Sequence, residues 1–137
     1  MKLPEQLSAL TILLAEDDLD DQELLNDAFA QIDPQIHVQM VSNGKKVVEY
    51  LNSLTNQQLP GLVILDYNMP ELDGAQVLQV LNQDQRLQGI PKLVWSTSSS
   101  RAYKSICLEL GARAYFEKPN TVNGLQEMAR TMLQFCA

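Results

Sequence analysis

The amino-acid sequence predicts an α/β fold in which a doubly wound, five-stranded parallel sheet is covered by five helices. Two observations carry this prediction. Short apolar runs alternate along the 137-residue chain with longer amphipathic segments. The residues that end the first, third, fourth and fifth runs are acidic, hydroxyl or basic. Because crossover connections are right-handed, few ways remain to wind such a sheet.

The first half of the chain is predicted to form three strands and two helices. The apolar run Thr11–Ala15 indicates a buried strand, and an apolar stripe over Asp20–Ile32 predicts a helix. Alternation over Ile36–Val41 predicts a second strand, and Gly44–Leu54 a helix with a polar face. The apolar run Leu62–Leu65 predicts a third strand that stops at an aspartate.

The second half is predicted to form two strands and three helices. A loop with proline and glycine leads into a helix over Ala75–Asn82, and a proline precedes the strand Lys92–Trp95. Glycine, a favourable helix terminator, follows the predicted helix Arg101–Leu110. The strand Ala114–Glu117 and the helix Val122–Phe135 complete the pattern.

Composition and charge restrict the function classes. We expect a single domain over residues 1–137, with a core at about 11–136 and no output domain. The net charge of −7 argues against direct binding of nucleic acid, which requires a basic surface. We expect no membrane association and a cytoplasmic protein, because neither a long apolar span nor a signal peptide is evident. The two cysteines, Cys107 and Cys136, are expected to be reduced thiols.

Polar side chains gather where the predicted strands end. Glu16 and Asp17 follow the first strand, Asp66 the third, Ser96 the fourth and Lys118 the fifth. The carboxyl ends of parallel strands meet at one edge of the sheet, where ligands bind in open α/β folds. We therefore expect these side chains to lie together.

This set of residues is suited to phosphoryl transfer. Crowded carboxylates repel one another, and a hard divalent cation such as Mg²⁺ relieves the repulsion. A carboxylate beside a metal can act as the nucleophile toward a phosphoryl group. The metal, Lys118 and the Ser96 hydroxyl could then hold the phosphoryl oxygens.

Each feature has a simpler explanation when taken alone. The acids of segment 16–21 could form a solvated first helical turn, and Asp66 could begin a loop. Residues 96–100 could serve only to cap the next helix, and Lys118 could be a surface residue. All four strand ends would then have to coincide by accident, which favours a functional site.

The sequence resembles the receiver domains of bacterial response regulators from about Thr11 to the last helix. Four segments carry the resemblance in the right order: ILLAEDD, VILDYNMPELDG, IPKLVWSTS and LGARAYFEKP. It implies a flavodoxin-like strand order, 2-1-3-4-5, and a stand-alone regulator similar to the chemotaxis regulators. The stretch NQDQRLQGIPKLVWSTSS is also similar to the regulators found beside phytochrome-type histidine kinases.

The resemblance implies a role for each motif residue. Asp66 matches the phosphoacceptor, Asp17 a direct Mg²⁺ ligand, and Glu16 an acid that acts on the metal through water. The backbone carbonyl of Asn68 matches a further metal ligand. The remaining roles fall on residues near the other strand ends: Ser96 matches the switch hydroxyl, Tyr115 the switch aromatic, Lys118 the lysine that pairs with the phosphorylated aspartate, and Pro119 the partner of Lys118 in a cis peptide bond.

Four positions depart from the commonest pattern of the family. Glu16 replaces Asp, Ser96 replaces Thr, Trp95 replaces a smaller aliphatic residue and Asn120 replaces an apolar one. None of these differences removes a chemical role. For Tyr115, packing as an aromatic at the sheet edge is an alternative to switching.

Three other kinds of protein fit the sequence less well. An FMN-binding flavodoxin needs a hydroxyl- or glycine-rich loop after the first strand, where this chain has Glu16-Asp17-Asp18. A haloacid-dehalogenase-type phosphatase carries a second aspartate two residues after the nucleophile, where this chain has Asn68. A pseudo-receiver would lack the key aspartate or lysine, and both are present.

The expected partners follow from the resemblance. A sensor histidine kinase or a phosphotransfer protein would donate the phosphoryl group, and the domain would assist its own phosphorylation and dephosphorylation without being an enzyme. The signal would leave by association with a downstream protein, through a surface that includes Arg101, Tyr103, Lys104 and Glu109. A homodimer is a further possibility. His37 is expected to lie away from the site.

Overall fold

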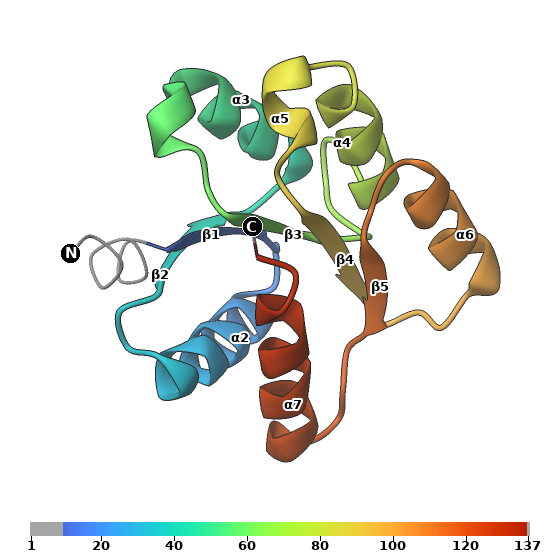
Figure 1. Ribbon diagram of the computed structural model, residues 1–137. Coiled ribbons are helices and arrows are strands. Elements are labelled where there is room, and N and C mark those ends of the chain that lie inside the picture. Colours follow the sequence, from blue (N-terminus) through green and yellow to red (C-terminus); the bar gives the residue numbers. More distant parts are fainter. Residues whose placement is uncertain (1–9, 137) are drawn as a thin grey trace.

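Five parallel strands form the middle layer of this computed structural model, which describes residues 10–136 (Figure 1). The strand order is β2-β1-β3-β4-β5, so the chain moves to one edge of the sheet first and then crosses back toward the other. The predicted parallel sheet and its order, 2-1-3-4-5, are confirmed. The strands are β1 Thr11–Ala15, β2 His37–Val41, β3 Leu62–Asp66, β4 Lys92–Ser96 and β5 Ala114–Glu117.

Helices cover both faces of the sheet (Figure 1). On one face, α3, α4, α5 and α6 pack around Val47, Val77 and Cys107. On the other face, α2 and α7 pack around Phe29 and Met132. The helices are α2 Leu19–Ile32, α3 Gly44–Ser53, α4 Gly74–Leu81, α5 Gln85–Gln88, α6 Arg101–Glu109 and α7 Val122–Leu133, with a 3₁₀ turn at Asn56–Gln58.

The number of helices differs from the prediction of five, because residues 10–136 contain six α-helices. The additional element is α5, whose four residues are too few to show an apolar period in the sequence. Local contacts fix its ends. Asp84 accepts a hydrogen bond from the Arg86 backbone N–H, and Lys92 Nζ donates to the carbonyls of Leu87 and Ile90.

The central strands are buried on both sides, which explains why their sequences are continuously apolar. Every residue of β3 and β4 is buried, whereas β2 at the edge is only partly covered. The predicted ends of the other elements agree with the structure to within two residues.

Polar residues at the helix N-termini fix where the main helices begin. The side chains of Asp18, Asn43, Asp73, Ser100 and Thr121 each accept a hydrogen bond from a backbone N–H three residues later. The hydroxyl-rich loop at 96–100 therefore does provide a helix cap, through Ser100. This capping role leaves Ser96 available for another one.

A glycine allows α4 to begin directly against the end of β3. A Cβ atom at Gly74 would lie 3.0 Å from the Asp66 carbonyl oxygen and 3.0 Å from Tyr67 Cα. The Gly74 N–H donates to the Tyr67 carbonyl at 2.8 Å. The loop between them includes Glu71, which has a positive φ of 71°. The segment after Asp66 is thus held in a tight turn.

Three smaller predictions can be compared with the structure. His37 is exposed and begins β2, at the opposite end of the strand from the acidic residues, as expected. Cys107 is buried and Cys136 half-buried, both as free thiols. Within residues 10–136, none of the helices combines the length and apolar character needed to cross a membrane.

Candidate functional site

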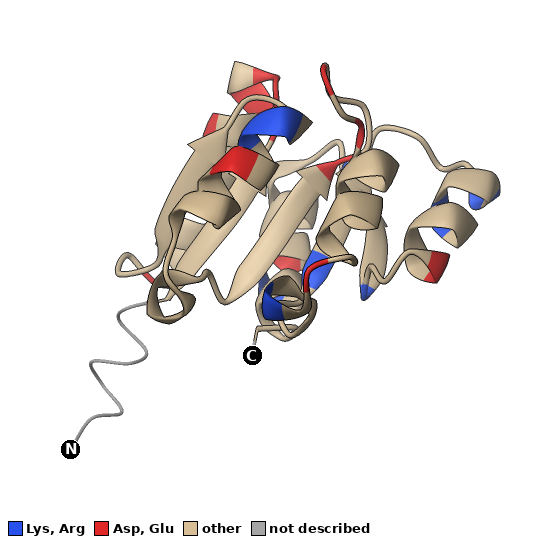
Figure 2. Ribbon diagram, turned by 90° about the horizontal axis from the view of Figure 1, so that it is seen from above, with Lys and Arg blue, Asp and Glu red and all other residues tan. Residues whose placement is uncertain are grey.

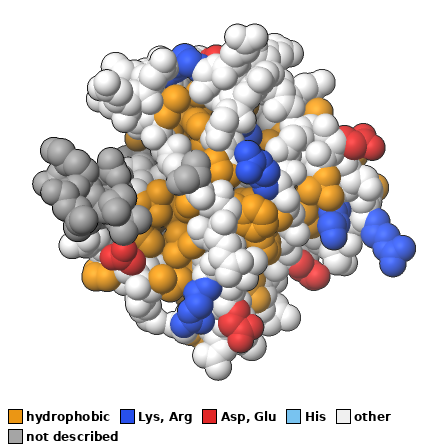
Figure 3. Space-filling model, in the orientation of Figure 1, with side chains coloured by type: hydrophobic (Ala, Val, Ile, Leu, Met, Phe, Trp, Pro, Cys, Tyr) orange, Lys and Arg blue, Asp and Glu red, His pale blue; other side chains and the backbone are white. Residues whose placement is uncertain are grey.

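Acidic side chains gather at the carboxyl edge of the sheet. In Figure 2 the ribbon is coloured red for Asp and Glu around the tips of the strand arrows, on the side away from the two labelled ends of the chain. Figure 3 looks onto the opposite edge, where the visible acids are scattered singly. The strand ends thus come together as the sequence predicted, and their acids share one edge.

Lys118, directly after β5, lies at the centre of this cluster. Its Nζ atom is 2.7 Å from Glu16 Oε1, 2.9 Å from Asp21 Oδ2 and 3.5 Å from Asp66 Oδ2. The Lys118 side chain is only 11% exposed, so its pairs with the buried Glu16 and Asp66 are shielded from water, whereas its pair with Asp21 is partly exposed. A backbone hydrogen bond of 2.7 Å from Lys118 N–H to the Ser96 carbonyl fixes its position beside β4.

Three carboxylates lie close enough to bind one cation together. One oxygen from each of Glu16, Asp17 and Asp66 lies within 4.8 Å of the other two. Glu16 and Asp66 are buried, and Asp17 is exposed. The set consists only of hard oxygen ligands, with one side open to solvent, which is the arrangement that Mg²⁺ accepts.

Burial and charge crowding perturb the ionisation of this cluster. Burial, together with the neighbouring Asp66, raises the pKa of Glu16 to about 8, although Lys118 acts in the opposite direction. Burial alone would lower the pKa of Lys118, but hydrogen bonds to Asp21 and Glu16 outweigh this effect and raise it. Lys118 therefore stays an ammonium ion. Because the carboxylates outnumber it, the cluster can also accommodate a cation.

The surroundings of Asp66 include polar groups from two loops. The backbone N–H of Asn68 donates to Asp66 Oδ1 at 3.2 Å, and Asn68 itself is exposed. Ser96, at the end of β4, is fully buried and its Oγ accepts a hydrogen bond from Ser98 N–H at 3.0 Å. Because that oxygen acts as an acceptor, the Ser96 O–H proton is free to be donated elsewhere.

Tyr115 connects the loop after Ser96 to the face covered by α6. Its hydroxyl donates to the Ser98 carbonyl at 2.8 Å, and its half-buried ring packs against the core that includes Cys107. A second aromatic contact joins the same region. The rings of Tyr67 and Tyr103 stack with centroids 4.2 Å apart, which links the residue after Asp66 to α6.

The indole of Trp95 forms the floor beneath Lys118. The Nζ atom lies 4.7 Å from the ring centroid, a distance suited to a cation–π interaction. Trp95 is only 2% exposed, and its Nε1 atom has no hydrogen-bond partner among residues 10–136. The large residue that departs from the family pattern thus packs directly against the central lysine.

One prediction for this site is wrong. Residues 10–136 contain no cis peptide bond, so the bond between Lys118 and Pro119 is trans. The trans form is favoured before proline by about 0.5–1 kcal/mol, and only a specific tertiary constraint reverses that preference. The sequence motif does not by itself supply such a constraint.

The sequence pattern predicts no separate role for Asp21, although this residue lies in the acidic segment. Asp21 is in the first turn of α2 and forms one of the two hydrogen bonds of the Lys118 ammonium. The available signal was its spacing of four residues from Asp17, about one helical turn. That spacing could not show which of the neighbouring acids faces Lys118.

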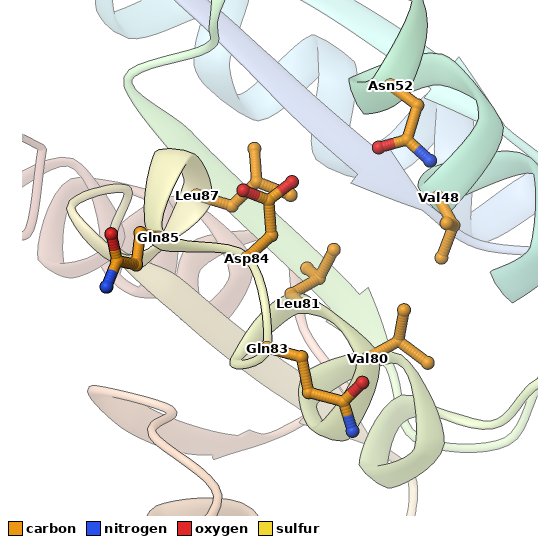
Figure 4. A pocket seen from close by; sticks show the side chains of 8 residues that line it. All are labelled: Val48, Asn52, Val80, Leu81, Gln83, Asp84, Gln85 and Leu87. Atoms are coloured by element: carbon orange, nitrogen blue, oxygen red, sulfur yellow. The ribbon is translucent and has the colours of Figure 1, made fainter.

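One hollow away from this site lacks comparable chemistry. A cavity of about 490 Å³ lies between α3, α4 and α5, and its lining includes Val48, Val80, Asp84 and Leu87 (Figure 4). Its polar residues are amides and a single acid, whose Oδ1 already accepts the Arg86 backbone N–H. It lies at the C-terminal ends of α3 and α4, away from the acidic cluster.

Comparison with known proteins agrees with this geometry. Residues 12–130 match the response regulator receiver domain family. The chain is 28% identical over 131 residues to the probable methanogenesis regulatory protein FilR2 of Methanothrix harundinacea, which covers 90% of this chain and 81% of FilR2. It is 28% identical over 124 residues to response regulator Rre1 of Synechocystis sp., covering 90% of this chain and 52% of Rre1.

The chain spans 38% of the chemotaxis protein CheV2 of Helicobacter pylori, so several relatives are considerably longer. Among solved structures, the phosphorylated cyanobacterial phytochrome response regulator RcpA is similar with a TM-score of 0.84. It is 28% identical, and the match covers 93% of each chain.

Proposed function

This chain belongs to the response regulator receiver domains of two-component systems, and we propose that it accepts a phosphoryl group on Asp66 with the assistance of Mg²⁺. The observation that carries the proposal is the position of the Asp66 carboxylate. It lies at the end of β3, with Lys118 Nζ at 3.5 Å and two further acids close by.

The acidic cluster fits a divalent cation. Glu16, Asp17 and Asp66 provide oxygen ligands within 4.8 Å of one another, and burial, together with the neighbouring Asp66, raises the pKa of Glu16 although Lys118 acts in the opposite direction. We assign Asp17 and Asp66 as direct ligands, the Asn68 carbonyl as a third, and Glu16 as a partner through water. When bound, Mg²⁺ supplies electrostatic stabilisation of the transferring phosphoryl group.

The residues of the chain then have separate tasks in the transfer. An Asp66 carboxylate oxygen attacks phosphorus, the new O–P bond forms, and the bond between phosphorus and the donor imidazole nitrogen breaks. Lys118 and the Ser96 hydroxyl hold phosphoryl oxygens as negative charge spreads over them. Burial of Asp66 and Ser96 keeps water away from these contacts and strengthens them.

A protein with a phosphorylated histidine is the donor in this proposal, either a sensor kinase or a phosphotransfer protein. The edge of the sheet where the donor would dock carries two exposed apolar side chains. Leu19 begins α2 and is 73% exposed, and Val122 begins α7 and is 64% exposed. In the sequence Leu19 lies two residues after Asp17, and Val122 lies four residues after Lys118. Similarity to RcpA supports a donor of the phytochrome type.

The output in this proposal is association with another protein after phosphorylation. Movement of Ser96 toward the phosphoryl group would alter the loop that Tyr115 binds through the Ser98 carbonyl. The same ring packs on the face of α6, so the populations of two conformations there would shift. Arg101, Tyr103, Lys104 and Glu109 are the α6 residues we assign to this surface.

Intact-mass measurement after incubation with acetyl phosphate tests the proposal. Wild-type protein should gain one phosphoryl group in the presence of Mg²⁺ and none after chelation, and Asp66→Asn should gain none. Asp27→Asn serves as the control, since it removes an exposed acid of α2 outside the cluster. Wild type that gains no mass, while a control receiver is labelled, would contradict phosphorylation and favour a pseudo-receiver that only binds partners.

A further inference from the structure

Lys118 is bound more closely by Asp21 than by the proposed phosphoacceptor. The distance from Nζ to Asp21 Oδ2 is 2.9 Å, against 3.5 Å to Asp66 Oδ2. Hydrogen bonds run from Nζ to Asp21 and to Glu16, whereas the contact with Asp66 is an ion pair only. In this state two of the three N–H donors of the ammonium group are directed away from the residue that reacts.

Asp21 is not one of the carboxylates that could bind the cation. The three carboxylates that converge within 4.8 Å are those of Glu16, Asp17 and Asp66, and Asp21 is outside that set. Its side chain is 30% exposed, in contrast to the fully buried Glu16. The Asp21 carboxylate therefore contacts Lys118 and not the proposed metal position.

A closed ring of hydrogen bonds fixes Asp21 in this position. Asp18 N–H donates to Glu16 Oε2, and Asp21 N–H donates to Asp18 Oδ1, which caps α2. Lys118 Nζ closes the ring by donating to both Glu16 Oε1 and Asp21 Oδ2. The turn between β1 and α2 thus orients the Asp21 carboxylate toward Lys118, so that the ion pair is preorganised.

We propose that Asp21 is a positioning residue, which holds Lys118 in a resting ion pair and competes with the phosphoryl group for it. The inference rests on the proposed function, and it concerns what limits the rate of phosphoryl uptake by Asp66. No covalent bond to Asp21 forms. As phosphorus is transferred to Asp66, the ammonium exchanges its bond to Asp21 Oδ2 for one to a phosphoryl oxygen, while Trp95 remains beneath it.

The direction of the effect follows from this competition. Weakening the Asp21 bond leaves Lys118 more often available to Asp66 and to the incoming phosphoryl group. A partly exposed ion pair of this kind contributes little energy, so we expect the rate of phosphoryl uptake to rise roughly fivefold and not by orders of magnitude. A residue that merely supported the fold would instead lower the rate or leave it unchanged.

Three variants test the inference through the rate of phosphoryl uptake from acetyl phosphate at fixed Mg²⁺. Asp21→Asn keeps the shape and removes the charge. Asp20→Asn removes the same charge from the adjacent, exposed position in the same helical turn. Asp21→Glu restores the carboxylate. We expect faster uptake by Asp21→Asn alone, with Asp20→Asn and Asp21→Glu close to wild type.

Equal acceleration in Asp20→Asn and Asp21→Asn would overturn the inference, because it would reflect net charge alone. Uptake by Asp21→Asn at or below the wild-type rate would also overturn it, and a lowered thermal midpoint in that variant would then identify a structural role. If wild type itself takes up no phosphoryl group, the proposed function fails and the inference fails with it. That outcome is recognised from wild type without any variant.

Discussion

The two edges of the sheet each hold a shielded lysine, and the two lysines have opposite surroundings. Lys118 at the carboxyl edge contacts three carboxylates, whereas Lys92 at the amino edge of β4 donates to two backbone carbonyls, of Leu87 at 2.6 Å and of Ile90 at 3.0 Å. Lys118 has a raised pKa because its hydrogen bonds to carboxylates outweigh the effect of burial. Burial, with a smaller contribution from Arg113, lowers the pKa of Lys92.

The same residue type thus has two different kinds of hydrogen-bond partner at the two ends of the strands. Neutral carbonyls satisfy the donors of Lys92 but compensate little of the cost of burying its charge. Carboxylates compensate the charge of Lys118 and, in an excess over it, leave the cluster able to receive a cation. Lys92 therefore joins α5 to the sheet, while in the proposed function Lys118 exchanges a carboxylate for a phosphoryl oxygen.

Replacement of Lys118 by methionine is expected to give the largest effect. The variant keeps most of the aliphatic volume but loses the cation that faces the transferring phosphoryl group. Loss of one such electrostatic contact slows a transfer step by about a hundredfold or more. The rate of phosphoryl uptake from acetyl phosphate, followed by intact mass, measures it. A rate within a factor of about two of wild type would show that Lys118 does not act on the transfer.

Replacement of Lys92 by methionine should separate the two edges. It leaves the Ile90 and Leu87 carbonyls without their lysine donor and weakens the attachment of α5. We expect the free energy of unfolding to fall by about 1–3 kcal/mol, with phosphoryl uptake unchanged in the folded protein. Urea denaturation and the same mass assay measure the two quantities. Slow uptake in a folded Lys92→Met protein would show that the edges are coupled.

The smallest expected effect concerns the pH dependence of stability in the metal-free protein. The pKa of Glu16 is about 8 in the folded protein, above its ordinary value of 4.5. Between these values the unfolded chain gives up the Glu16 proton while the folded protein keeps it. The contribution of Glu16 is therefore full below pH 4.5 and is lost as the pH rises toward 8.

We expect the free energy of unfolding to fall by about 1 kcal/mol more in wild type than in Glu16→Gln between pH 5 and pH 6. Denaturation in urea with a chelator present, at several pH values, measures this difference. Glu49→Gln, at an exposed position of α3, is the control and should follow wild type. Identical pH profiles for wild type and Glu16→Gln would mean that the proton on Glu16 is not linked to folding.

The parallel sheet and the gathering of most of the clustered residues could be predicted from the residue pattern alone. The apolar runs are continuous because the central strands are buried on both sides, and that pattern does not depend on distant contacts. Parallel strands bring their carboxyl ends to one edge by geometry alone. The association of Glu16, Asp17, Asp66 and Lys118 therefore followed once the strand ends were placed, and Ser96 came to that edge in the same way.

The four residues of α5 show no period of their own, and Arg86 of α5 donates a hydrogen bond to Asn56 Oδ1, 30 positions earlier in the chain. The sequence contains five acids between residues 16 and 21, but only the folded turn shows that Asp21 reaches Lys118, 97 positions away. The trans bond before Pro119 is of the same kind, since the isomer is set by packing and not by the Lys-Pro pair itself.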